Sequence, residues 1–185
     1  MFILDSNNFK KARLTFTLIL LNVVLFFVIY FNFEIFYLFV QINDRILYNF
    51  EYWRLLTAIF VHGNPLHLFS NMFGLLLFGT FVESSLPKYQ YLIIFFCSGL
   101  IGNLFSLLFL PGNIISLGAS GAIFGLIGTS FLMVAMQEDK SLLFLGTLYV
   151  ILFLLSSFSP GINIYAHFFG LIGGIIFGYL FYKKR

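Results

Sequence analysis

Charged residues are scarce in this chain. Lys and Arg together number 10, and Asp and Glu number 7, so only 9% of the 185 residues are charged. A soluble domain has about 25% charged residues, and a chain with so few of them cannot cover a surface that faces water. The hydrophobic fraction of 61% and the mean hydropathy of +1.01 agree with this reading. The composition therefore predicts an integral membrane protein.

Cysteine is nearly absent as well. Cys97 is the only one, and it lies inside an apolar run. A disulfide within the chain is therefore excluded, and we interpret Cys97 as a small core residue.

Long apolar runs make up most of what is present. A helix needs about 20 mostly apolar residues to cross a bilayer, and six runs approach this length: 14–31, 67–83, 90–110, 119–136, 141–157 and 165–182. The first run follows three basic residues but lacks a cleavage site of small residues, so we interpret it as a permanent span. The sequence predicts an all-α membrane protein with one six-helix domain over residues 1–185. The aromatic-rich connection at 32–66 is expected to lie in the membrane interface.

The basic residues are distributed unevenly about these spans. If there are six spans, only Arg45 and Arg54 fall on one side of the membrane. The other eight fall on the opposite side: Lys10, Lys11, Arg13, Lys88, Lys140, Lys183, Lys184 and Arg185. The positive-inside rule then places both termini in the cytoplasm. The same asymmetry accounts for the basic pI without a nucleic-acid partner.

Several polar residues stand where a membrane helix begins. With cytoplasmic termini, the even-numbered spans run inward, and His67, Ser120 and His167 open the second, fourth and sixth of them at the external side. Asn71 shares a helix face with His67, since it lies four residues later. Polar groups at membrane depth are costly and mark functional sites. We therefore expect these four side chains to converge.

Glycines predict which helices touch. Each of two spans carries a stripe of glycines at helical spacing: Gly121, Gly125 and Gly128 in the fourth, and Gly170, Gly174 and Gly178 in the sixth. Small residues let membrane helices approach closely. Because Ser120 precedes the first stripe and His167 the second, packing of the two stripes would bring this hydroxyl and this imidazole together.

Acidic residues are missing from the external ends of the spans. Glu83, at the cytoplasmic end of the second span, is the only acid in any of them, and no H-E-x-x-H zinc motif is present. The missing motif argues against a zinc protease. The missing acids exclude an aspartyl dyad and a Ser-His-acid triad, and they disfavour an ion pathway. A Ser120–His167 dyad remains, in which the imidazole takes the hydroxyl proton. The candidate donors to an oxyanion are the Ser120 backbone N–H, the Asn71 amide and a ring N–H of His67.

Together these residues resemble the rhomboid family of intramembrane serine proteases. "GASG" (118–121) is similar to the family's GxSG nucleophile motif, and "HLFSN" (67–71) to its HxxxN motif. "AHFFGLIGG" (166–174) is similar to AHxxGxxxG, and "WR" (53–54) to a pair in the family's first external loop. The resemblance covers essentially all 185 residues as a minimal six-helix core.

The resemblance implies a role for each matched residue. Ser120 would be the nucleophile and His167 its general base. His67, Asn71 and the Ser120 backbone would form the oxyanion hole. The supporting positions are Gly118 for the turn into the fourth helix, Gly121, Gly170 and Gly174 for packing, Phe124 where many members stack a Tyr on the imidazole, and Trp53 and Arg54 as loop anchors in the outer leaflet.

The resemblance also implies an activity. It predicts a serine endopeptidase that cleaves transmembrane segments of other proteins near the external face, without cofactor or metal. Its partners would be transmembrane protein substrates and the lipid bilayer, and not nucleic acid, with the oligomeric state left open. Its expected place is a prokaryotic plasma membrane, with the active site facing outward. A non-catalytic binder of client membrane helices is the alternative, and a small transporter or channel is a third, less favoured reading.

Overall fold

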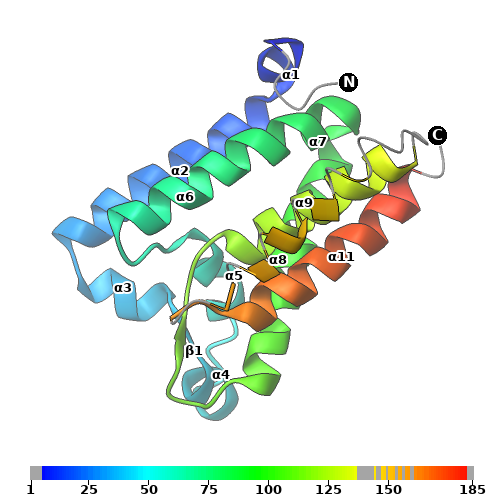
Figure 1. The fold of residues 1–185 in the computed structure, drawn as a ribbon. Coiled ribbons are helices and arrows are strands. Elements are labelled where there is room, and N and C mark those ends of the chain that lie inside the picture. Colours follow the sequence, from blue (N-terminus) through cyan, green and yellow to red (C-terminus); the bar gives the residue numbers. More distant parts are fainter. Residues whose placement is uncertain are drawn as a thin grey trace.

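The computed structural model describes residues 6–136 and 161–182, together with 144, 147–148, 150–152, 154–155 and 157–158 between them. Four helices in this part of the chain are long and apolar enough to cross a membrane: α2 (Arg13–Phe31), the continuous helix Pro65–Ser85, α8 (Lys88–Phe109) and α11 (Ile164–Tyr182). The apolar helix α9 (Ser120–Ala135) has 16 residues and is shorter. The helices pack into a bundle, preceded by the short helix α1 (Ser6–Lys11) (Figure 1).

These helices match five of the six predicted spans and confirm a helical, multi-pass membrane protein. Eight of the 17 residues of the fifth predicted span, 141–157, lie outside the described residues. So do Lys140, Lys183, Lys184 and Arg185, on which the orientation partly depends. The count of six helices and the cytoplasmic termini therefore stay predictions.

The second span begins at a capped turn and changes its winding halfway. It consists of α6 (Pro65–Gly74), the π-helical turn η2 (Leu75–Gly79) and α7 (Thr80–Ser85). The Asn64 side chain accepts the backbone N–H of His67 at 2.8 Å, and Pro65 occupies the first helical position. The cap therefore places His67 in the first turn of α6.

A buried carboxylate joins the end of α7 to the start of α2. Glu83 accepts the backbone N–H groups of Leu14 (2.9 Å) and Thr15 (2.8 Å), and also the Thr15 hydroxyl (2.8 Å). The first N–H groups of a helix have no partner within it and favour negative charge. This contact holds α2 and α7 at one level, at the end of the bundle opposite to His67.

Residues 32–64 form short elements rather than an extended loop. They are α3 (Glu34–Phe39), β1 (Gln41–Ile42), α4 (Asn43–Asn49), α5 (Arg54–Thr57) and the 3₁₀ turn η1 (Ala58–Phe60). The strand β1 pairs antiparallel with β2 (Ile115–Ser116), with Gln41 opposite Ser116. The chain just before α9 is thereby attached to this segment (Figure 1).

The helix α9 is the centre of the bundle. All ten residues from 121 to 130 are buried, as expected for a helix that has neighbours on every side. Its side chains contribute to the main hydrophobic cluster together with Phe81, Tyr91 and Phe95 of α7 and α8. Ser120 stands at the start of this central helix.

The predicted glycine stripes lie in direct contact, with α9 and α11 running side by side (Figure 1). A Cβ on Gly170 would collide with the backbone of Gly121, and one on Gly174 with the carbonyl oxygen of Gly125. The Thr129 hydroxyl adds a hydrogen bond to the Gly174 carbonyl at 2.8 Å. This close backbone contact is the geometry that small residues permit in membranes.

Two adjacent glycines of α11 provide a matched test of this contact. Gly174→Ala should lower the unfolding midpoint in detergent, because the new methyl group meets backbone that cannot move away; overpacking of this kind costs about 1–3 kcal/mol. Gly173→Ala should stay near the wild-type midpoint, since the nearest atom to its Cβ would be the flexible tip of Ile101, at 3.2 Å. Equal midpoints for the two variants would contradict the packing described here.

Candidate active site

The turn before α9 places a histidine ring beside the start of the helix. Gly118 has a φ of +118°, in the region that favours glycine. A Cβ there would lie 2.8 Å from Nε2 of His67 and 3.8 Å from Oγ of Ser120. The backbone N–H of Gly118 donates to the Ala58 carbonyl at 2.9 Å, which fixes the turn. His67, Gly118 and the half-buried Ser120 are therefore neighbours, as the sequence predicts.

The position of Asn71 agrees less clearly with its predicted role than the position of His67 does. It is buried on α6, and its Nδ2 donates to the His67 carbonyl at 2.9 Å, within its own helix. Among the described residues, its Oδ1 has no hydrogen-bond partner. Nδ2 carries two N–H groups, and the bond to the His67 carbonyl uses one of them.

The His167 ring is held on its face and on its edge. It lies in the first turn of α11 with 8% of its surface exposed. Phe124 of α9 stacks on it, with ring centroids 4.2 Å apart and planes 16° from parallel. Its Nδ1 lies 2.7 Å from the hydroxyl oxygen of Ser157. The stacking predicted for Phe124 is present without a tyrosine hydroxyl.

Backbone packing brings the neighbours of Ser120 and His167 together. A Cβ on Gly121 would lie 3.3 Å from the Ala166 carbonyl oxygen. Ser120 directly precedes Gly121, and His167 directly follows Ala166. The hydroxyl and the imidazole therefore lie at the same end of two helices in contact.

Ser157 is a site residue that the sequence reasoning missed. It is the last residue of the predicted fifth span. Under the predicted topology that position is external, on the side of Ser120. A polar residue at the external end of an odd-numbered span was the signal that could have identified it.

His62 is a second residue without a role predicted from the sequence. Its ring is 2% exposed and lies edge-on to the His67 ring, with centroids 5.1 Å apart. Burial, and to a lesser degree the charge of His67, lower the pKa of His62 to about 3, and a contact with the Phe60 carbonyl opposes this only slightly. Within the described chain, no group of three or more His, Cys, Asp or Glu side chains is arranged to hold a metal ion.

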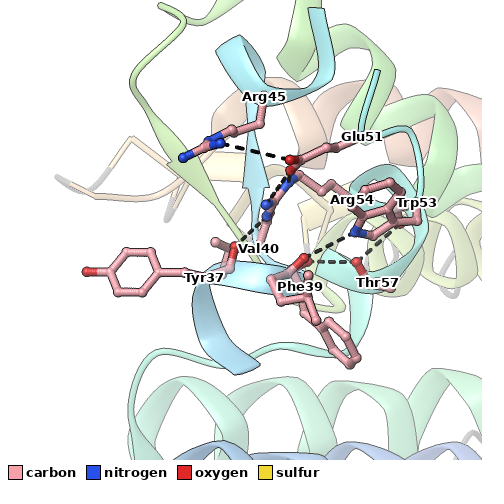
Figure 2. Close-up of polar contacts among 9 residues, drawn as sticks. Tyr37, Phe39, Val40, Arg45, Glu51, Trp53, Arg54 and Thr57 are labelled. Carbon is pink, nitrogen blue, oxygen red and sulfur yellow. Dashed lines mark hydrogen bonds and ion pairs between the residues drawn. The ribbon is translucent and has the colours of Figure 1, made fainter. Parts of the chain in front are cut away.

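Arg54 anchors the segment before α6 (Figure 2). Its guanidinium is buried, donates to the carbonyls of Tyr37 and Val40, and forms an ion pair with Glu51. Arg45 approaches the other oxygen of Glu51 at 4.0 Å. The guanidinium thus satisfies carbonyls around the end of α3 that no helix bond reaches.

Trp53 and Thr57 bind the same turn (Figure 2). The indole Nε1 of Trp53 donates to the Leu38 carbonyl at 3.2 Å, and the Thr57 hydroxyl donates to the Phe39 carbonyl at 2.8 Å. The Trp53 ring itself is about half exposed, at 48%. Both residues of the "WR" pair therefore bind carbonyls at the end of α3.

Comparison with known proteins covers the site and the helices that carry it. The family model described as Rhomboid domain matches residues 49–184. YdcA of Bacillus subtilis (strain 168) is 36% identical over 143 residues, which are 74% of this chain and 71% of YdcA. The rhomboid protease GluP of the same organism is 33% identical over 174 residues, 89% of this chain and 34% of GluP.

One plant relative is named as an inactive protein. Inactive RHOMBOID-like protein 8 of Arabidopsis thaliana is 34% identical over 134 residues, which are 69% of this chain and 36% of that protein. This chain thus covers about a third of the length of GluP and of the plant protein. With the family model matched over most of its length, this chain belongs to the rhomboid family.

Proposed function

We propose that this protein is an intramembrane serine endopeptidase that cleaves transmembrane segments of other membrane proteins near the external face. The observation that carries the proposal is the placement of His167 beside the start of α9. Its ring stacks on Phe124, one turn after Ser120, and its Nδ1 is engaged by Ser157. The other ring nitrogen, Nε2, is then left to serve Ser120.

The reaction follows from these positions. Nε2 of His167 takes the proton of the Ser120 hydroxyl while Oγ bonds to the scissile carbonyl carbon. The carbonyl oxygen becomes an oxyanion, and the peptide C–N bond breaks as His167 returns the proton to the leaving nitrogen. Water then attacks the acyl-enzyme with His167 again as base, which releases the carboxylic acid and restores Ser120.

Three groups are proposed to stabilise the oxyanion. The Ser120 N–H is the first of α9, so it has no partner within the helix and lies at the positive end of the helix dipole. The His67 ring is included because it lies against Gly118, two residues before Ser120. Asn71 would contribute the amide N–H that does not bond to the His67 carbonyl. Donors placed in advance of the reaction are usually the largest single contribution to catalysis.

The proposed substrates must unwind before they can be cleaved. An intact membrane helix keeps its carbonyls in hydrogen bonds, so segments with helix-breaking residues should be preferred. The distribution of Lys and Arg supports a site on the external side of a prokaryotic plasma membrane.

The alternative, a non-catalytic binder of client helices, is kept because one relative is named inactive. A binder would retain client helices without reacting with a serine-directed probe. Labelling with a fluorophosphonate therefore separates the two proposals.

Ser120→Ala should abolish cleavage of a transmembrane substrate reconstituted in liposomes and remove fluorophosphonate labelling. Loss of a serine nucleophile lowers the rate by several orders of magnitude, on the order of 10⁶-fold in the best-studied case. Ser130→Ala is the control, since Ser130 also lies on α9 but is fully buried and donates to the Leu126 carbonyl at 2.8 Å. Cleavage by Ser120→Ala at the wild-type rate would end the proposal.

The cleavage rate should fall reversibly as the pH is lowered. Protonated His167 cannot accept the Ser120 proton. His62 is not the cause, because a pKa lowered to about 3 leaves this ring neutral above that pH. The fall should persist in His67→Gln, and return to neutral pH should restore the rate. A cleavage rate that is the same at neutral pH and at about pH 3 would contradict a histidine base.

A further inference from the structure

We propose that Ser157 is a positioning residue for the dyad: its hydroxyl oxygen accepts the Nδ1–H of His167 and so presents the bare Nε2 to Ser120. This inference rests on the proposed function and deepens it. It assigns a third polar member to a site in which the sequence offers no acid.

The contact is short, buried and tertiary. Oγ of Ser157 and Nδ1 of His167 are 2.7 Å apart, and 1% of Ser157 is exposed. The two residues are ten apart in the chain, and α11 begins only at Ile164. The bond is therefore made between α11 and the segment before it, rather than by helical periodicity.

The chemistry of imidazole decides the direction of this bond. A neutral histidine carries one N–H, on either nitrogen, and the partner of one nitrogen determines the state of the other. A base at Nε2 requires the proton on Nδ1, so the Ser157 oxygen must accept it. When Nε2 takes the Ser120 proton, the Nδ1–H belongs to a cation and its hydrogen bond becomes charge-assisted. In a buried site such a bond is stronger than it is in water.

Stacking on Phe124 cannot do this alone. A half-turn of the ring about its bond to Cβ leaves its plane unchanged, and so leaves the 4.2 Å stacking unchanged. The same rotation exchanges the positions of Nδ1 and Cδ2, and those of Nε2 and Cε1. Phe124 therefore fixes the plane of the ring, and the bond to Ser157 keeps Nε2, rather than the carbon Cε1, on the side that faces Ser120.

A purely structural role would use the same bond differently. Ser157 would then hold its segment against α11, and its loss would lower stability without changing the histidine tautomer. The two roles are separated by a kinetic and a spectroscopic measurement on the same set of variants.

The kinetic test compares Ser157→Ala, Ser157→Thr and the buried-serine control Ser130→Ala in liposomes. Ser157→Ala should lower kcat and the rate constant of fluorophosphonate labelling about 10- to 100-fold, by analogy with the loss of the hydrogen-bond partner of a metal-binding histidine. KM should change little, and Thr should restore most of the rate, because it keeps the hydroxyl. Ser130→Ala should match the wild type.

The spectroscopic test reads the tautomer directly from ¹⁵N shifts of labelled histidine in detergent at neutral pH, with His167→Asn used for assignment. The wild type and Ser120→Ala should show His167 protonated at Nδ1, and Ser157→Ala should show a mixture. Protonation at Nε2 in the folded wild type would overturn the proposal, even if Ser157→Ala failed to fold. So would an unchanged tautomer in Ser157→Ala, or a wild-type kcat in that variant.

Failure of the proposed function would look different. A wild-type protein that neither cleaves nor labels would refute the endopeptidase, while the tautomer would still show whether Ser157 orients His167.

Discussion

The contact between the backbones of α9 and α11 is the constraint on which the site depends. No side chain separates Gly121 from Gly170 or Gly125 from Gly174, so the distance between the two helices is set by main-chain atoms. Side chains can change rotamer to absorb an error, but backbone within a helix cannot. Because Ser120 and His167 lie near the start of these two helices, the backbone contact determines the distance between them.

The chain outside the helices positions the remaining groups. Gly118 is held by the Ala58 carbonyl, and β1 holds the chain two residues earlier at Ser116. The chain just before β1 is in turn held by the bonds of Arg54 to the carbonyls of Tyr37 and Val40. The His67 ring fills the space that a Cβ on Gly118 would occupy. Non-helical backbone is tolerated at membrane depth only where protein or water provides its hydrogen-bond partners, and the contacts above provide such partners.

The parts of this fold that a sequence can predict are those that follow a period or a run. Apolar length predicted α2 and α8, and glycine spacing predicted the contact of α9 with α11, since both are one-dimensional patterns. The contacts of Ser157 and Arg54 follow no such pattern. Backbone carbonyls, which Arg54 binds, are present at every residue, and the pairing of Gln41 with Ser116 joins two-residue strands far apart in the chain. The π turn at Leu75–Gly79 also has no sequence signal that we can identify.

The energetic cost of burying a carboxylate explains why a hydroxyl, rather than an acid, lies beside His167. Glu83, the one carboxylate within the predicted spans, is held by three donors from Leu14 and Thr15. An ion removed from water without such partners costs several kcal/mol. A carboxylate at the position of Ser157 would need a comparable set of donors within reach of a proton-accepting imidazole, and those donors would compete for its lone pair. A neutral acceptor would orient the ring without that burden, and in the proposed reaction the positive charge formed on His167 would strengthen the same bond.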